Sequence, residues 1–263
     1  MNCEITMPLL SNTTTNRYGS IAAEIYDIDK PVGVMPDTAF HVPRLAGLCG
    51  AILEPACGSG RALLPLLEAG CDATGFDPSP EMLNRCRARC DAGGFSPGLS
   101  RMRFEDFHYD RLFSAVFVPV GSFGLVDDFD VALAVLRRFA DHLERGGLLV
   151  LDVQPVSFLK AVGDDRRRWI AANGDLLTVD GRRLDTDWIT QREERHLRYE
   201  RWRDNRLMET QLEPMALRYW SVQEMTLALR ATGFGAVSVF GDYNRHRPPT
   251  SGARSLTFEA TLA

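Results

Sequence analysis

The sequence predicts an α/β fold: a mostly parallel sheet with helices on both faces, and a small antiparallel sheet inserted late in the chain. Residues 51–83 follow the order strand, glycine turn, helix, strand. The apolar runs 112–120 and 148–153 are continuous, which is typical of strands buried on both faces. Residues 165–220 have no helical periodicity and alternate as antiparallel strands do. We therefore expect a doubly wound sheet with an inserted antiparallel β lid.

Composition limits the functions that the chain can have. Its 263 residues, 45% hydrophobic and 25% charged, fit one large domain or one domain with an insert. The net charge of −5 argues against a nucleic-acid partner. With no leader and no run of about 18 apolar residues, we expect no membrane segment and a cytoplasmic location. The six cysteines lack paired zinc spacing, so free thiols and no metal are expected: Cys3, Cys49, Cys57, Cys71, Cys86 and Cys90.

The first strand–helix–strand unit carries a glycine turn and two acids. The apolar run from Ala51 ends on Glu54, and a turn with Gly58 and Gly60 leads into a helical pattern. Glycines let the backbone approach a ligand closely because they have no Cβ. Asp77 ends the second strand about 20 residues later, the position from which an acid accepts hydrogen bonds from ribose hydroxyls.

The spacing of this turn separates two cofactor classes. A dinucleotide site requires G-x-G-x-x-G, but the third glycine position holds Leu63. The pattern that fits is acid-x-small-x-Gly-x-Gly, from Glu54 to Gly60. Together with the block from Asp77 to Leu83 (DPSPEML), it resembles the motifs of the class I S-adenosylmethionine (SAM) dependent methyltransferases. Ala56 departs from the glycine that the family often has, but it is small enough to keep the floor of the site.

The resemblance implies a seven-stranded Rossmann-like sheet, with SAM as cofactor and S-adenosylhomocysteine as product. Asp106 is expected to bond the adenine amine, with Phe107 beside the ring, although Asp106 also fits a turn. The resemblance assigns the cofactor to these residues: Tyr26, Glu54, Ala56, Gly58, Gly60, Asp77, Pro78, Met82, Asp106, Phe107 and Pro119.

Local patterns divide the chain into segments, and the resemblance implies that the N-terminal helices cover the SAM pocket. Residues 1–50 are expected to form an N-terminal helical cover, with helices over 21–29 and 37–49. Residues 51–164 are expected to form the SAM-binding α/β core. Residues 165–220 would form the lid, and 221–263 would complete the sheet with a helix after the capping box at Ser221.

Finer boundaries follow from local patterns. We expect a third strand over 101–105, a helix over 130–144, and strands over 237–240 and 256–262. In the lid we expect strands over 185–191, 195–202, 207–212 and 215–220. Turn residues are expected at Asp180-Gly181 and Asp204-Asn205. Asp37 is expected to cap its helix, and the loop 242–252 to close over the acceptor.

The sequence predicts SAM-dependent methyl transfer to an oxygen or nitrogen of a small-molecule acceptor, with secondary metabolites among the acceptors. The alternatives are a SAM-binding protein without turnover and an NAD-type oxidoreductase. No base is assigned, since the methyl group is activated by the cofactor. The catalytic candidates are His196, Tyr199 and Gln154, and the acceptor candidates are Tyr18, Phe123, Gln154, Tyr199 and Tyr243. The resemblance leaves room for a homodimer.

Overall fold

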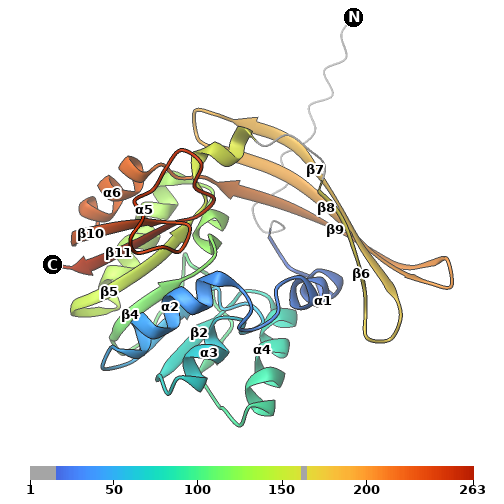
Figure 1. Ribbon diagram of the computed structural model, residues 1–263, viewed down its shortest axis with the longest axis horizontal. Helices are drawn as coiled ribbons and strands as arrows, with labels where there is room; N and C mark the ends of the chain where they lie inside the picture. Colours follow the sequence, from blue (N-terminus) through green and yellow to red (C-terminus); the bar gives the residue numbers. More distant parts are fainter. Residues whose placement is uncertain (1–15, 161–164) are drawn as a thin grey trace, which may run out of the picture.

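The computed structural model describes residues 16–160 and 165–263, and expectations for 1–15, including Cys3, lie outside them. Figure 1 shows a core of sheet and helices with a second sheet standing beside it. The core sheet has seven strands in the order β10-β11-β5-β4-β1-β2-β3, and the second has four in the order β6-β7-β8-β9. The predicted fold class is therefore confirmed.

The elements of the core follow the expected order. Its strands are β1 (Ile52–Pro55), β2 (Ala73–Phe76), β3 (Leu99–Ser100), β4 (Phe113–Val118), β5 (Leu143–Val153), β10 (Phe234–Gly241) and β11 (Leu256–Leu262). Its helices are α1 (Ser20–Asp29), α2 (Pro36–Ala46), α3 (Leu63–Glu68), α4 (Pro80–Ala92), α5 (Phe129–Asp141) and α6 (Val222–Ala231), with short 3₁₀ turns η2 (Ser122–Leu125) and η3 (Val156–Lys160). Strand β11 runs antiparallel to β5 and β10, whereas β1 to β5 pair in parallel.

The two faces of the sheet bury different helices, because successive side chains of a strand point to opposite faces. On β4, Val116 and Val118 belong to a cluster that includes α5 and α6. The alternate residues Ala115 and Phe117 join a cluster with Leu45 of α2 and residues of α3 and α4. Helices thus cover both faces, as the continuous apolar strands predicted.

Three helices begin at side-chain caps. Ser79 Oγ accepts a hydrogen bond from Met82 N in α4, and Asp128 does the same for Val131 in α5. Ser221 accepts from Glu224 N at the start of α6, which confirms the cap predicted there. The cap expected at Asp37 was wrong: Met35 occupies the N-cap of α2, and the Asp37 side chain pairs with Arg61 instead.

Other boundaries differ from the prediction. The third strand is Leu99–Ser100, and 101–107 forms a turn in which Phe107 N donates to Arg103 O. The lid strands are β6 (Asp165–Ile170), β7 (Leu176–Asp187), β8 (Arg192–Arg203) and β9 (Arg206–Arg218). Asp180-Gly181 is not a turn, because it lies within β7 and pairs with both neighbouring strands. Asp204 and Asn205 do form one, both with positive φ.

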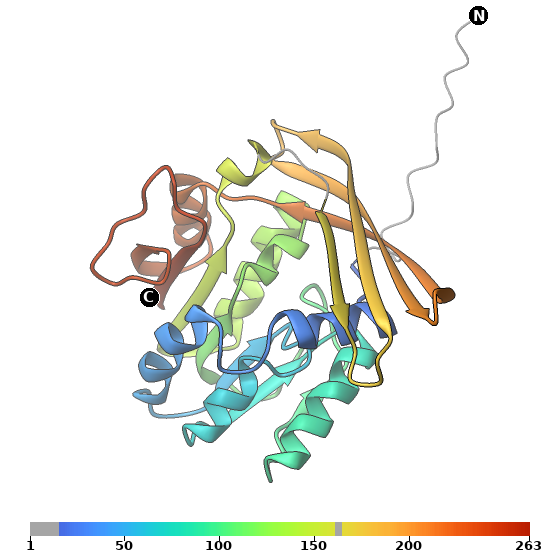
Figure 2. The same cartoon turned by 45° about the vertical axis from the view of Figure 1, so that its right-hand side comes forward.

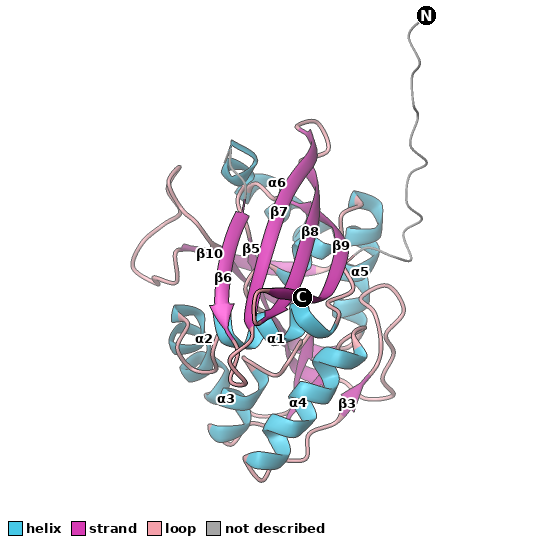
Figure 3. Cartoon of the chain, turned by 90° about the vertical axis from the view of Figure 1, so that its right-hand side faces the viewer, coloured by secondary structure: helices cyan, strands magenta, loops and turns pink. Residues whose placement is uncertain are grey.

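The second sheet stands against α1 and reaches back toward the end of the core sheet (Figures 2 and 3). Its inner face packs Leu177, Val179 and Tyr199 onto Ile21 and Ile25 of α1. Within the described residues, no helix has the length and apolar character needed to cross a membrane.

Candidate functional site

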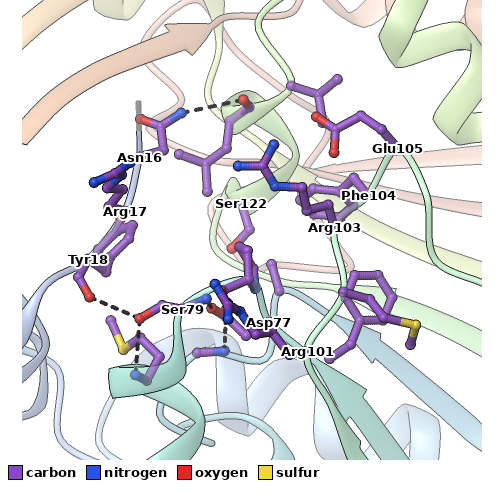
Figure 4. Close-up of a pocket in the computed structure, with 18 of the residues that line it drawn as sticks. Asn16, Arg17, Tyr18, Asp77, Ser79, Arg101, Arg103, Phe104, Glu105 and Ser122 are labelled. Carbon is purple, nitrogen blue, oxygen red and sulfur yellow. Dashed lines mark hydrogen bonds between the residues drawn. The ribbon is translucent and has the colours of Figure 1, made fainter. Parts of the chain in front are cut away.

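A cavity of about 1160 Å³ opens beside the carboxyl ends of β1, β2 and β4 (Figure 4). In an open α/β sheet, ligands bind at this edge. Three parts of the chain line it: the N-terminal segment and α1 (Asn16, Arg17, Tyr18, Gly19, Tyr26), the first strand–helix units (Ala56, Gly58, Phe76, Asp77, Pro78, Ser79, Pro80, Glu81, Met82), and the later loops (Arg101, Met102, Arg103, Phe104, Glu105, Asp106, Ser122, Leu125, Val126, Asp127, Asp128, Val131).

Asp77 is the central acid of this cavity. Its two carboxylate oxygens accept hydrogen bonds from Gly58 N at 2.9 Å and Ser79 N at 2.8 Å. Burial raises the pKa of Asp77 to about 6, although these two hydrogen bonds act in the opposite direction. The carboxylate is thus fixed at the end of β2 with lone pairs left for a ligand in the cavity.

The glycine turn forms a floor that a nucleoside can approach. Gly58 and Gly60 both have positive φ, and a Cβ on Gly60 would lie 2.7 Å from Cys86 Sγ. A Cβ on Gly58 would meet nothing closer than Met82 Sδ at 4.0 Å, so its open side faces the cavity. Leu63, at the third position of the dinucleotide pattern, is fully buried at the start of α3.

Glu54 lies beneath this turn at the end of β1. It is buried and does not line the cavity, and its Oε2 has no hydrogen-bond partner among the described residues. Burial raises the pKa of Glu54 well above its usual value. A buried acceptor without a donor is costly, so a donor brought next to Oε2 would stabilise the protein. These residues fit SAM, whose ribose hydroxyls and amino group are hydrogen-bond donors.

A buried ion pair that the sequence did not reveal supports the N-terminal cover. Arg61 binds both oxygens of Asp37, at 3.1 and 2.8 Å, and both side chains are almost fully buried. Burial raises the pKa of Tyr26, which lines the cavity, and the nearby charge of Arg61 opposes this rise. Arg61 follows Gly60 directly, and this position next to the glycine turn was the one sequence signal that could have placed it near the site. The pair joins α2 to the glycine turn.

The four-stranded sheet does not line the cavity with any of its described residues. It acts through Asn16–Gly19, which we call the strap. Asn16 Nδ2 donates to Ala216 O on β9 at 3.2 Å and to Leu125 O at 3.5 Å. Asn16 Oδ1 accepts a hydrogen bond from Ala216 N. Glu213 on β9 accepts hydrogen bonds from the backbone N–H groups of Tyr18 and Gly19.

The strap is also attached to the core. The Tyr18 carbonyl accepts a hydrogen bond from Ser79 Oγ at 2.9 Å, next to Asp77 (Figure 4). Tyr18 has a φ of +51°, and its ring lies edge-on to Tyr26 at 6.2 Å. Both tyrosines line the cavity.

The catalytic candidates of the lid are not brought to the cavity. Tyr199 is buried in the cluster between β8 and α1, where burial raises its pKa. His196 lies on β8, paired with Arg182 and Pro214 across the sheet. Neither lines the cavity, so the structure does not support them as bases. Alternation along a strand cannot show which elements the buried face covers.

The adenine-side expectation is corrected in part. Phe107 is fully buried against Phe76 and Phe139, and it does not line the cavity. The turn at 103–107 instead presents Phe104 to the cavity. Asp106 lines the cavity, but its Oδ1 accepts a hydrogen bond from Arg103 N at 3.0 Å, as a turn acid does.

Three of the remaining candidates lie outside the cavity as well. Phe123 is fully buried against Trp220 and Phe139. Gln154 packs near Gly121, while its backbone bonds to Trp220. Tyr243 packs on His41 and Phe40 of α2, away from the lining residues, so the loop 242–252 does not close over this cavity. In sequence, an aromatic residue of the core cannot be distinguished from one that lines a pocket, because both occur as apolar residues at strand ends.

The remaining cofactor candidates divide into residues that line the cavity and residues that do not. Of the cofactor candidates, five line the cavity: Ala56, Gly58, Asp77, Pro78 and Met82. Gly60 and Pro119 do not: Gly60 turns toward Cys86, and Pro119 precedes the left-handed residues Val120 and Gly121. The cysteines at 49, 57, 71, 86 and 90 are unpaired thiols.

Comparisons with known proteins agree with this geometry. Residues 52–147 match the family model of a methyltransferase domain. Over 167 residues the chain is 30% identical to the dTDP-3-amino-3,4,6-trideoxy-alpha-D-glucopyranose N,N-dimethyltransferase of Streptomyces venezuelae, covering 61% of this chain and 65% of that protein. Over 158 residues it is 30% identical to the cypemycin N-terminal methyltransferase of a Streptomyces species, covering 57% and 61%. The match thus spans a little under two thirds of each curated relative.

The whole fold matches solved structures as well. The CcbJ methyltransferase of Streptomyces caelestis superposes with a TM-score of 0.75 at 21% identity, covering 95% of this chain and 98% of that one. The match includes the four-stranded sheet as well as the core, since it covers nearly the whole chain. Residues 52–147 therefore match a methyltransferase domain, and nearly the whole chain has the fold of SAM-dependent methyltransferases of known structure.

Proposed function

We propose that the protein transfers the methyl group of SAM to a nitrogen or oxygen of a small-molecule acceptor. The observation that carries this proposal is the arrangement around Asp77: a desolvated carboxylate fixed by Gly58 and Ser79, above a glycine turn, at the edge of a large cavity. SAM would supply an activated methyl group on a sulfonium, so the protein needs to bind, orient and exclude water.

The residues present divide these tasks. Asp77 would accept the ribose hydroxyls, and Gly58 would let the backbone approach the cofactor closely. Phe104, Met82 and Pro78 would cover the base with apolar surface. The strap closes the opposite side of the cavity, where Tyr18 and Tyr26 exclude water from the reacting atoms.

A nitrogen acceptor suits this cavity best. The ionisable groups that line it are carboxylates, arginines and two tyrosines, Tyr18 and Tyr26, whose pKa values burial raises. An amine attacks with its lone pair and loses its proton without a strong base. The two curated relatives are named as an amino-sugar N,N-dimethyltransferase and an N-terminal methyltransferase, which supports the same choice.

Calorimetric titration with S-adenosylhomocysteine, and with NAD for comparison, tests the cofactor. We expect micromolar binding of the former, none of the latter, and at least a hundredfold loss in Asp77→Ala. Binding of NAD instead would establish the oxidoreductase alternative. Transfer of labelled methyl from SAM to a panel of amines and phenols then tests turnover, and binding without transfer to any of them would favour the non-catalytic alternative.

The cellular setting is part of the proposal. A small-molecule acceptor and no nucleic-acid partner agree with the net charge of −5, and a cytoplasmic location completes the proposal. A homodimer is a state to be tested by sedimentation.

A further inference from the structure

The cavity is larger than the cofactor half of the site requires. Its volume of about 1160 Å³ exceeds the roughly 300–1,000 Å³ that is usual for a single small-ligand site. The nucleoside would occupy the half around Gly58, Asp77, Met82 and Phe104, and the remainder extends between the strap, Arg103 and the turn at 122–128. The acceptor therefore has room for a group well beyond the atom that is methylated.

Arg103 projects into this remainder. Figure 4 shows its guanidinium pointing toward the middle of the cavity, with Asn16 and Arg17 on the opposite side. Its backbone N–H and carbonyl are bonded within the turn, whereas the guanidinium has no hydrogen bond or ion pair within residues 16–160 and 165–263. Arg101 flanks it on the cofactor side, where its Nε donates to Pro78 O at 3.2 Å and its terminal amines remain for a ligand.

None of the nearby acids forms an ion pair with Arg103, and most of them have another hydrogen-bond partner. Asp127 is bound by Arg192 Nε at 2.5 Å, and Asp128 caps α5 through Val131 N. Asp106 closes its own turn. Glu105 is the cavity acid on this side whose carboxylate has no partner among the described residues.

We propose that Arg103, assisted by Arg101, binds a phosphate or diphosphate group of the acceptor. This inference rests on the proposed methyl transfer and adds the acceptor's chemical class to it. An arginine fork binds two oxygens of a phosphate at once, through parallel charge-assisted hydrogen bonds. The acceptor is then a phosphorylated or nucleotide-linked amine, held by its anion at one end of the cavity and presenting its nitrogen at the other.

The test is calorimetric titration of the full chain, saturated with S-adenosylhomocysteine, with thymidine diphosphate, pyrophosphate and thymidine. We expect the diphosphates to bind at least tenfold more tightly than thymidine. Arg103→Gln should weaken the diphosphates at least tenfold while changing S-adenosylhomocysteine affinity less than twofold. Arg103→Lys should fall between, since it keeps the charge and loses the fork. Glu105→Gln should tighten diphosphate binding.

Arg87→Gln is the matched control, because Arg87 is an exposed arginine of α4 outside the cavity, and it should change neither affinity. Diphosphate affinity equal to that of thymidine, or unaltered by Arg103→Gln, overturns the proposal. Equal weakening of S-adenosylhomocysteine by Arg103→Gln also overturns it, since the arginine would then serve the cofactor. A wild-type protein that binds no S-adenosylhomocysteine overturns the proposed function itself, and the acceptor assignment with it.

Discussion

The part of the core around the glycine turn and the four-stranded sheet are stabilised by different forces. Around β1, β2 and α4, buried apolar side chains and backbone geometry hold the glycine turn, with Arg61 and Asp37 as a fully enclosed ion pair. The four-stranded sheet carries ion pairs along its strands, many of them half-exposed, such as Arg198 with Asp180 and Glu200. Burial thus stabilises the core where the ligand binds, whereas solvent and salt screen the exposed ion pairs of the second sheet.

The largest effect is expected in the aromatic core. Phe107→Ala should lower the free energy of unfolding by about 4 kcal/mol, because a fully buried ring stacked on Phe76 leaves a cavity. Urea titration measures this loss. At a temperature where the variant is folded, its affinity for S-adenosylhomocysteine should be unchanged. A loss of affinity without a loss of stability would instead show that Phe107 contacts the cofactor.

The enclosed ion pair comes next. Asp37→Ala should cost about 3 kcal/mol, because it leaves the Arg61 guanidinium buried without its carboxylate. Chemical denaturation of Asp37→Ala, Arg61→Met and the double variant measures it. The double variant should be more stable than Asp37→Ala alone, and strictly additive losses would contradict the pairing.

A pH effect distinguishes the site from the sheet that supports it. Asp77 must be ionised to accept ribose hydroxyls, and its pKa is raised to about 6, so affinity is full above that pH and lost below it. At pH 5 about one tenth of Asp77 is ionised, which weakens S-adenosylhomocysteine about tenfold relative to pH 7.5. Titrations at both pH values measure this loss of affinity. The residual binding of Asp77→Ala should not change between the two pH values. The same loss in that variant would mean that another group titrates.

The smallest effect is expected on the second sheet. Arg198→Gln should change the free energy of unfolding by less than about 0.5 kcal/mol, because both ion pairs of this arginine are exposed to solvent and salt. Thermal unfolding at low and high salt measures it. A loss of unfolding free energy as large as that of Phe107→Ala would contradict the conclusion that the two regions are stabilised by different forces.

Local motifs predicted the parts of the site that depend on backbone geometry. The positive φ of Gly58, the position of Asp77 at the end of β2, and the Ser221 cap follow from residue types at short spacing. Prediction failed where distant segments meet. The partners of Asn16, about 200 residues away on β9, and the Asp37–Arg61 pair leave no periodic signal.

By itself, the sequence determined the doubly wound sheet, the order of its elements and the cofactor turn. These follow from hydrophobic periodicity and from glycine conformations, which act over a few residues. Only the tertiary structure decided that the strap and not the second sheet lines the cavity, that Phe104 and not Phe107 faces it, and that Arg103 points inward. Those outcomes depend on which surfaces pack together, and packing joins residues far apart in the chain.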